Sequence, residues 1–253
     1  MTIRIPMMGE NAPSFRARTT HGGVNFPKDY EGKWVIFFSH PGDFTPVCTT
    51  EFMVFAKMQA EFRQLNTELL GLSVDSVQSH ISWLRSIKEK VEFNGISGMD
   101  VEFPIVEDKG LSISKKYGLL QPSENKRYMR YIQDIQDLQV DKATDDNENI
   151  NTSECNFMNI QPVRGIFIID PQSRIRYIAF YPISNGRNLD EIKRILQAIQ
   201  KTDSQNVDTP VNWNPGDDVI VRTPLSYEDA KKRMEDKELK CSEWYVCLKE
   251  DKS

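Results

Sequence analysis

The sequence predicts an α/β fold in which helices flank a mixed β-sheet. Short apolar runs rich in aromatic and β-branched residues alternate with stretches whose apolar residues recur every three or four positions. The first pattern is typical of buried strands and the second of amphipathic helices. The last two strand-like runs are separated only by PQSR (171–174), which indicates a hairpin and an antiparallel pair. This order of elements defines an α/β layer architecture with a mixed sheet.

Each predicted element rests on the spacing of its apolar residues. WVIFFS (34–39) is continuously apolar, as expected for a strand buried on both faces. The stretch that follows Thr49 changes to helical spacing, with apolar side chains at Phe52, Phe55 and Phe62. In chain order we predict a strand over 34–39, a helix from Thr49, a strand over 69–75, a helix over 76–92, a strand over 103–108, a short helix over 109–120, strands over 163–170 and 175–181, and a helix over 188–200.

Two regions break this alternation. Residues 121–161 are mostly polar, which predicts an exposed insertion, and Cys155 lies there beside the carboxylate Glu154, so we expect it to be unreactive. From Thr202 the chain is rich in turn residues and then helix-like over 225–240. We expect this tail to have too few apolar residues for its own core and to pack on another surface, such as a partner subunit. The predicted organisation is a domain over 1–200 that contains the insertion, followed by an extension over 201–253.

Composition limits the classes of function. The chain has 253 residues, a net charge of −5 and a pI near 5.4, which argues against a partner such as nucleic acid or an acidic membrane surface. Neither a basic start followed by an apolar run nor about 18 consecutive apolar residues occurs in the sequence. These features predict a cytoplasmic protein.

Cysteine spacing argues against a structural role for most of the thiols. Four cysteines in a chain of 253 residues are not the disulfide framework of a small secreted fold. Only Cys241 and Cys247 are close in sequence, and all three histidines lie far upstream, so no zinc site and no other metal site is predicted. The cysteines are therefore inert or redox-active.

Cys48 occupies a position that favours a reactive thiol. The first turn of a helix offers unpaired N–H groups and the positive end of the helix dipole, and both stabilise a thiolate. Thr45, three residues earlier, either caps this helix or donates to a small oxygen-containing substrate, and both roles are compatible. Pro41 either excludes water from the site or only ends the strand. Because Thr45 stands where a Cys-x-x-Cys motif has its first cysteine, the segment suits attack on a small molecule such as a peroxide rather than local disulfide exchange.

The segment HPGDFTPVCTTE (40–51) resembles the active-site motif of peroxiredoxins, Pro-x-x-x-Thr/Ser-x-x-Cys, with Pro41, Thr45 and Cys48 at the three defined positions. The resemblance continues through most of the chain outside 121–161. FSH before the motif and the long tail are similar to the one-Cys-type subfamily. The further matching segments are SVDSVQSHISWL, VRGIFIID, YPISNGRNLDEI and TPVNWNPGDDVIV.

This resemblance implies a thioredoxin-like fold with a C-terminal dimerisation extension and a thiol-dependent peroxidase without a cofactor. Cys48 would be the peroxidatic cysteine, and Arg164 would stabilise its thiolate and, with Thr45, hold the peroxide. Arg187 corresponds to a second arginine near the site, and Glu51 to the carboxylate that orients both arginines. Thr45, Arg164 and the backbone N–H of Cys48 are the candidates for aligning the peroxide and stabilising the leaving oxygen.

His40 corresponds to a histidine that lies near the pocket in this subfamily. Two roles stay open for it: a catalytic residue, or a packed side chain that does not titrate.

The tail cysteines resemble the paired C-terminal cysteines of archaeal-type members. By that resemblance a tail cysteine of the partner subunit would resolve the Cys48 sulfenic acid, with Cys247 favoured over Cys241; the alternative is two ordinary, partly buried cysteines. The expected partners are hydrogen peroxide and organic hydroperoxides, a thioredoxin-like or other thiol reductant, and a second copy of the chain in a homodimer or in a ring of dimers such as a decamer.

Three other functions are alternatives to a peroxidase. A phospholipase side activity is rejected, because Lys33 stands where some one-Cys members carry the required serine. A thioredoxin-like disulfide exchanger is disfavoured by the missing second cysteine near Cys48. A non-enzymatic holdase or redox relay on the same scaffold stays open, and peroxide turnover with a recycling reductant would separate it from a peroxidase.

Overall fold

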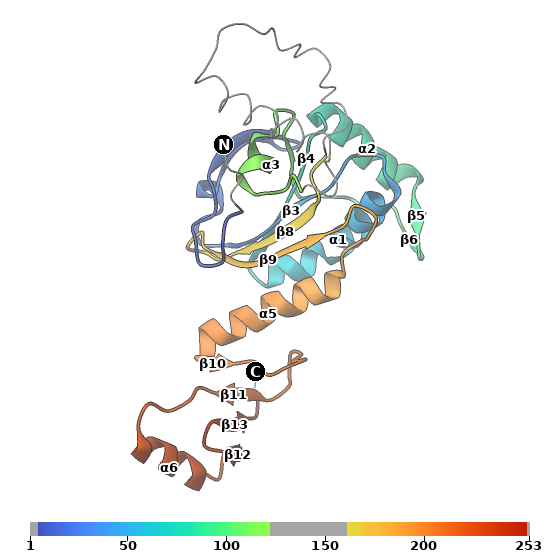
Figure 1. The fold of residues 1–253 in the computed structure, drawn as a ribbon. Helices are drawn as coiled ribbons and strands as arrows, with labels where there is room; N and C mark the ends of the chain where they lie inside the picture. The colour runs from blue at the N-terminus through green and yellow to red at the C-terminus, as the bar shows by residue number, and fades with distance from the viewer. Residues whose placement is uncertain (1–4, 122–160, 252–253) are drawn as a thin grey trace, which may run out of the picture. The chain divides into compact units, whose positions relative to one another are not determined.

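The structure, a computed structural model, describes residues 5–121 and 161–251 of the chain (Figure 1). The chain divides into two compact units, residues 1–187 and residues 188–253. Most of the predicted insertion over 121–161, with Cys155, lies outside the described residues. Within the described ranges, none of the helices has the length and apolar character needed to cross a membrane.

The first unit is built on a seven-stranded sheet with the order β2-β1-β7-β4-β3-β8-β9. The central strands β3, β4 and β7 run parallel, whereas β8 and β9 add to β3 as an antiparallel pair. The predicted mixed sheet is therefore confirmed. Its strands are β1 (Phe15–Thr19), β2 (Gly22–Phe26), β3 (Trp34–Ser39), β4 (Thr67–Ser73), β7 (Ile105–Glu107), β8 (Arg164–Ile169) and β9 (Ile175–Tyr181).

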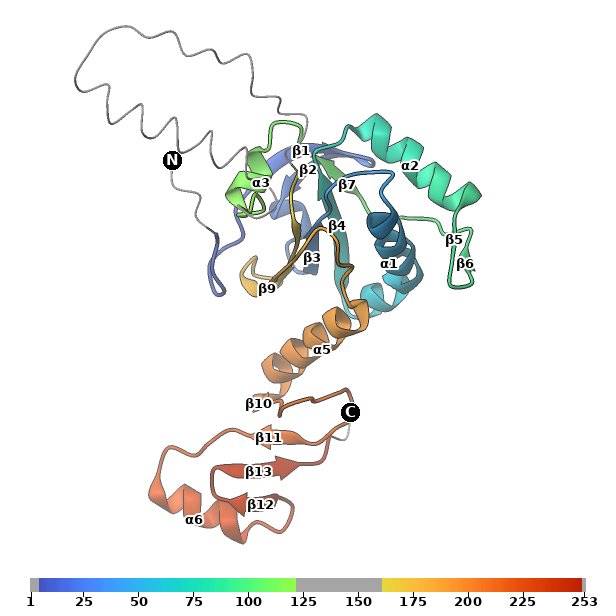
Figure 2. The same cartoon turned by 45° about the vertical axis from the view of Figure 1, so that its right-hand side comes forward.

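Helices cover both faces of this sheet, as Figure 2 shows: α3 lies on one side, and α1 and α2 lie on the other. Helix α1 spans Pro46–Gln64, α2 spans Val77–Lys90 and α3 spans Ser112–Lys116. Smaller elements are the 3-10 turn η1 (Lys28–Tyr30) and the hairpin of β5 (Glu92–Phe93) and β6 (Ile96–Ser97).

The core explains why the central strands are continuously apolar. All six residues of β3 are buried, because helices pack on both faces of the sheet. On the α3 side, Phe37 packs against Tyr117 with 4.7 Å between ring centroids, and Phe167 lies 5.1 Å from the same ring. This packing fixes the end of β3, from which the chain leaves toward Cys48.

The second unit begins with α5 (Leu189–Gln205) and continues as a four-stranded sheet with the order β10-β11-β13-β12. The apolar residues of the tail do not form a core by themselves but pack on α5 of the same chain. Val207, Trp213 and Val219 form a small buried cluster with Ala198 and the half-buried Ile195. Ala198 and Ile195 belong to α5, so the core of the second unit is formed jointly by the tail and the helix that precedes it. The remaining elements are β10 (Val207–Asp208), β11 (Val219–Val221), α6 (Tyr227–Glu235), β12 (Lys240–Glu243) and β13 (Val246–Lys249).

Candidate active site

The loop between β3 and α1 places Cys48 in the first turn of a helix. Helix α1 begins at Pro46, three residues before the predicted start, because proline is well suited to the first helical position and needs no N–H partner there. The first backbone bond of the helix joins the Thr49 N–H to the Thr45 carbonyl at 3.0 Å. The Cys48 N–H therefore precedes the hydrogen-bonded part of the helix and has no acceptor within it.

Thr45 is the N-cap residue, but its side chain accepts no capping hydrogen bond. Its hydroxyl instead donates to the Gly42 carbonyl at 2.9 Å. The oxygen keeps its lone pairs as acceptors for a proton of a bound substrate. Thr45 therefore does not cap the helix through its side chain, which was one of the two roles predicted for it.

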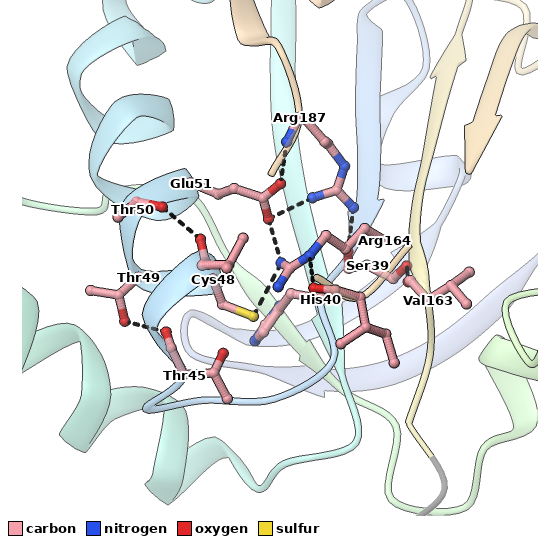
Figure 3. Close-up of polar contacts among 12 residues, drawn as sticks. Ser39, His40, Thr45, Cys48, Thr49, Thr50, Glu51, Val163, Arg164 and Arg187 are labelled. Carbon is pink, nitrogen blue, oxygen red and sulfur yellow. Dashed lines mark hydrogen bonds and ion pairs between the residues drawn. The ribbon is translucent and has the colours of Figure 1, made fainter. Parts of the chain in front are cut away.

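Arg164, the first residue of β8, lies directly against the thiol. Its Nη1 is 3.3 Å from Cys48 Sγ and also donates to Glu51 Oε2 at 2.8 Å, while its Nε donates to the Ile183 carbonyl at 2.9 Å (Figure 3). The Arg164 side chain is 2 % exposed. Although Arg164 is the first residue of its strand, its side chain is buried rather than exposed.

Glu51 joins both arginines, as Figure 3 shows. Its Oε2 accepts from Arg164 and, at 2.9 Å, from Arg187 Nη1, and its Oε1 accepts from the Arg187 backbone N–H at 2.8 Å. Arg187 Nη2 also donates to the carbonyls of Ser39 and Gly165. Burial lowers the pKa of Arg187, and the charge of Glu51 acts in the opposite direction.

The positive charge of this cluster is only partly neutralised within it. Two guanidinium groups and one carboxylate, all almost fully buried, carry one net positive charge next to Cys48 Sγ. An unpaired charge in a buried site is costly, so the net positive charge of this cluster favours a negatively charged group beside it. Cys48 itself has no exposed surface.

His40 belongs to a buried cluster that sequence reasoning missed. Its Nε2 is 3.0 Å from Asp43 Oδ1, and His80 Nδ1 is 2.9 Å from Asp43 Oδ2. Burial acts to raise the pKa of Asp43, but the hydrogen bonds from the two imidazoles outweigh it and hold that pKa well below its usual range. An ionised Asp43 accepts from both rings through His40 Nε2 and His80 Nδ1. The other ring nitrogens, His40 Nδ1 and His80 Nε2, are buried and have no hydrogen-bond partner among the described residues.

Burial lowers the pKa of His40, with the Asp43 carboxylate opposing this effect. His40 is therefore neutral near pH 7, and its ring packs between Phe52 and Trp83, at centroid distances of 4.8 and 5.2 Å. These contacts favour the packed role over a titrating one. The nitrogen and oxygen atoms of His40, Asp43 and His80 also lie within 4.8 Å of one another, so these three residues could hold a metal ion.

Pro41 lies on the wall of a polar hollow of about 890 Å³ beside the same loop. Thr45, Asp75, Lys109, Leu111 and Gln161 are among the other residues that line it. The loop is held in place by the Asp43 N–H, which donates to Asp75 Oδ2 at 2.9 Å. The hollow gives a molecule larger than water a place next to Thr45.

The structure brings together Cys48, Arg164, Glu51 and Arg187 in the first unit. Cys241 and Cys247 lie in the second unit and form a disulfide with each other. They occupy directly opposed positions on β12 and β13, with their Cα atoms 4.0 Å apart. This pairing was not predicted from the sequence, which left open either a tail cysteine that resolves Cys48 or two ordinary, partly buried cysteines.

Comparison with known families places this site in a defined class. Residues 8–178 match the AhpC/TSA family, and residues 198–237 match the C-terminal domain of 1-Cys peroxiredoxin. The chain therefore belongs to the AhpC/TSA family and is a peroxiredoxin, a thiol-dependent peroxidase.

Individual relatives agree over nearly the full length. A peroxiredoxin of Methanosarcina mazei is 49% identical over 249 residues, covering 98% of this chain and 99% of the relative. A peroxiredoxin of Thermotoga maritima is 42% identical over 253 residues, with the same coverage.

Solved structures confirm the predicted thioredoxin-like fold with a C-terminal extension. A yeast mitochondrial 1-Cys peroxiredoxin has a TM-score of 0.73 at 34% identity, and peroxiredoxin 6 of Arenicola marina has a TM-score of 0.74 at 28% identity. Each comparison covers 98% of this chain and 100% of the other.

Proposed function

We propose that Cys48 is the peroxidatic cysteine of this peroxiredoxin. Its thiolate attacks the terminal oxygen of a peroxide, the O–O bond breaks, and the leaving oxygen takes a proton and departs as water or an alcohol. Cys48 is oxidised by two electrons to the sulfenic acid. The observation that carries this proposal is the 3.3 Å contact of Arg164 Nη1 with Cys48 Sγ inside a buried cluster with one net positive charge.

The neighbouring groups have distinct tasks in this proposal. Arg164 stabilises the thiolate and then the charge on the leaving oxygen, and the Cys48 N–H adds a second donor. Thr45 accepts the proton of the bound peroxide and so aligns it with the sulfur. Glu51 and Arg187 hold Arg164 in place, and Pro41 shields the site from water.

The substrates we propose are hydrogen peroxide and organic hydroperoxides. The hollow of about 890 Å³ beside Pro41 and Thr45 supports the second class, because it is large enough for an organic group on the leaving side. Lys109 and Asp75 on its wall provide one positively charged and one negatively charged side chain.

For the sulfenic acid we propose resolution by a tail cysteine, with Cys247 favoured, from the partner subunit of a homodimer. Its thiol condenses with Cys48–SOH and releases water. The second tail thiol then attacks this mixed disulfide, releases the Cys48 thiolate and leaves Cys241 bonded to Cys247. The opposed positions of the two cysteines support this last exchange, because it needs no further rearrangement of their backbone.

A thioredoxin-type reductant would return the tail disulfide to two thiols. The yeast relative is described with glutathione and thioredoxin systems, which supports a protein or peptide thiol in this role. A cytoplasmic location and assembly into dimers, or into rings of dimers, complete the proposal.

The central claim is tested by replacing the nucleophile. Cys48→Ser is expected to abolish peroxide consumption, because a serine hydroxyl is not ionised in this site and is a far weaker nucleophile. Consumption is measured directly with a peroxide assay in the presence of dithiothreitol, with Cys155→Ser as the matched control. Full activity of Cys48→Ser would contradict the proposal, and binding of unfolded proteins without turnover would favour the holdase.

The resolving step predicts a covalent dimer. One equivalent of peroxide added to the reduced Cys241→Ser variant is expected to give a Cys48–Cys247 disulfide between subunits, because the second exchange cannot follow. Non-reducing gels and peptide mass spectrometry identify it. Only monomer on the gel, together with full thioredoxin-dependent activity of both Cys241→Ser and Cys247→Ser, would refute the resolving role.

A further inference from the structure

An apolar groove of about 520 Å³ lies in the second unit, between α6 and the β12–β13 hairpin. Leu225, Tyr227, Ala230, Met234 and Trp244 line it, together with Pro224. Leu225 is 103 % exposed and Tyr227 is 82 % exposed, values unusual for such large apolar side chains. This groove belongs to neither the peroxide site nor the small core of the second unit.

The groove adjoins the tail disulfide. Trp244, on its wall, lies in the two-residue turn that joins β12 to β13, and these strands carry Cys241 and Cys247. Cys241 Sγ is 3.8 Å from the carbonyl of Arg233, the residue on α6 next to the groove residue Met234. The same helix and the same hairpin therefore form both the groove and the surroundings of the disulfide.

The two sulfurs of this disulfide differ in access. Cys247 has no exposed surface, and its Sγ lies 3.4 Å from the Glu243 carbonyl, whereas Cys241 is only half-buried. In thiol–disulfide exchange the incoming thiolate approaches one sulfur from the side opposite the leaving sulfur, so access decides which is attacked. Cys241 is the sulfur that a molecule on the surface can reach.

We propose that this groove is the docking site for the protein dithiol that recycles the enzyme, and that the dithiol attacks Cys241; this rests on the proposed function. Its thiolate bonds to Cys241 Sγ, the Cys241–Cys247 bond breaks, and Cys247 leaves as a thiolate and takes a proton. The second thiol of the reductant then attacks the mixed disulfide and releases Cys241. The reductant ends as its own disulfide, having given two electrons.

The chemistry of the groove selects a protein over a small thiol. Its lining is mainly apolar, and its two charged residues, Lys231 and Glu235, have opposite signs. Such a surface suits an apolar loop beside a reactive cysteine, because burial of apolar area supplies the contact energy. Glutathione is small and carries net negative charge, so this groove offers it little.

The docking surface is tested with a bacterial thioredoxin at saturating peroxide. Trp244→Ala and Leu225→Ser are each expected to lower kcat/KM for thioredoxin about tenfold, the effect of truncating an interface anchor. The rate constant of Cys48 oxidation in a single turnover and reduction of the tail disulfide by dithiothreitol are expected to stay unchanged. Val211→Ser, which removes another exposed apolar side chain of the same unit outside the groove, is the matched control.

Leu225 is fully exposed, so its variant keeps the fold even if Trp244→Ala disturbs the hairpin. Unchanged thioredoxin kinetics in Leu225→Ser would overturn the docking site. A changed oligomeric state of Leu225→Ser relative to the wild type would also overturn it, because it would show that a second copy of the chain covers the groove. Glutathione as efficient as thioredoxin would also overturn it. Loss of Cys48 oxidation in the wild type would instead mark failure of the proposed function.

The attacked sulfur is tested by trapping. Thioredoxin whose second active-site cysteine is changed to serine cannot complete the exchange, so it stays bonded to the sulfur that it attacks. Peptide mass spectrometry of the trapped complex with the oxidised full-length chain is expected to show the bond at Cys241. A bond at Cys247 or Cys48 would overturn the assignment.

Discussion

Glu51 shows how one carboxylate can organise an active site. It stands one helical turn after Cys48 and accepts hydrogen bonds from Arg164 on β8 and from both the side chain and the backbone of Arg187. The sequence suggested that Glu51 orients the arginines only through the family resemblance, since a glutamate in a first turn is ordinary on its own. Its burial between two cations makes it essential to both the fold and the placing of Arg164.

Glu51→Gln is expected to lower the free energy of unfolding by about 3 kcal/mol, because it leaves two buried guanidinium groups with too little negative charge. The rate constant for peroxide is expected to fall at least tenfold, since Arg164 loses the partner that orients it. Urea unfolding and stopped-flow oxidation measure the two effects. Glu89→Gln, which breaks an exposed pair with Arg85, is the control and should change stability by less than about 1 kcal/mol.

The loop between β3 and α1 is positioned by elements distant in sequence. Asp43 binds His40 at the end of β3, His80 on α2, and, through its N–H, Asp75 after β4. This arrangement sets the direction in which α1 begins and therefore where Cys48 lies. It was not predicted, because a single aspartate in a motif gives no sign that its partner is a histidine 37 residues away.

Asp43→Asn tests this anchoring. Asparagine has one acceptor oxygen, so one of the two imidazole N–H groups would face an amide donor unless that ring changes its tautomer. We expect a loss of about 2 kcal/mol in unfolding free energy and a slower reaction of Cys48 with peroxide. Asp100→Asn, at an exposed pair with Lys88, is the control. If urea unfolding gave equal midpoints for the two variants, Asp43 would not anchor the loop.

At the scale of the whole molecule, the elements that the sequence predicts are those with strong apolar patterns. Strand β3 is continuously apolar, and α1 has a regular apolar face, so both were placed to within three residues. Strands β1 and β2 were not predicted, because their five residues each include exposed glycine or polar positions. The strands of the tail are shorter still, and β12 has only one apolar residue, Cys241.

The candidate site was predicted unevenly for the same reason. The motif identified Cys48, Thr45 and Pro41, and the resemblance added Arg164, Arg187 and Glu51, whose side chains the structure brings together. The bond between Cys241 and Cys247 depends on the hairpin register of β12 and β13, and that register follows from pairing in space, which no local pattern reveals.

The buried cluster around His40 predicts how stability of the whole molecule depends on pH. Burial lowers the pKa of His40 below its unfolded value of about 6.5. The neighbouring His80 also lowers this pKa, whereas Asp43 and Asp75 act to raise it. The unfolded chain therefore binds a proton that the folded chain excludes. Stability is complete above about pH 6.5 and falls as the pH drops, by up to about 1.4 kcal/mol per pH unit. The lowered pKa of Asp43 adds a further loss below about pH 4.

Urea unfolding at pH 7.5 and pH 5.5 measures this dependence. We expect the wild type to lose stability between the two values, and His40→Asn to lose less, because asparagine does not titrate. His21→Asn, at an exposed histidine, is the control and should follow the wild type. Since His40 lies directly before Pro41 at the end of β3, its protonation would also disturb the loop that holds Cys48, so peroxidase activity should fall in the same range of pH. Equal stability of the wild type at both pH values would contradict the burial of a neutral His40.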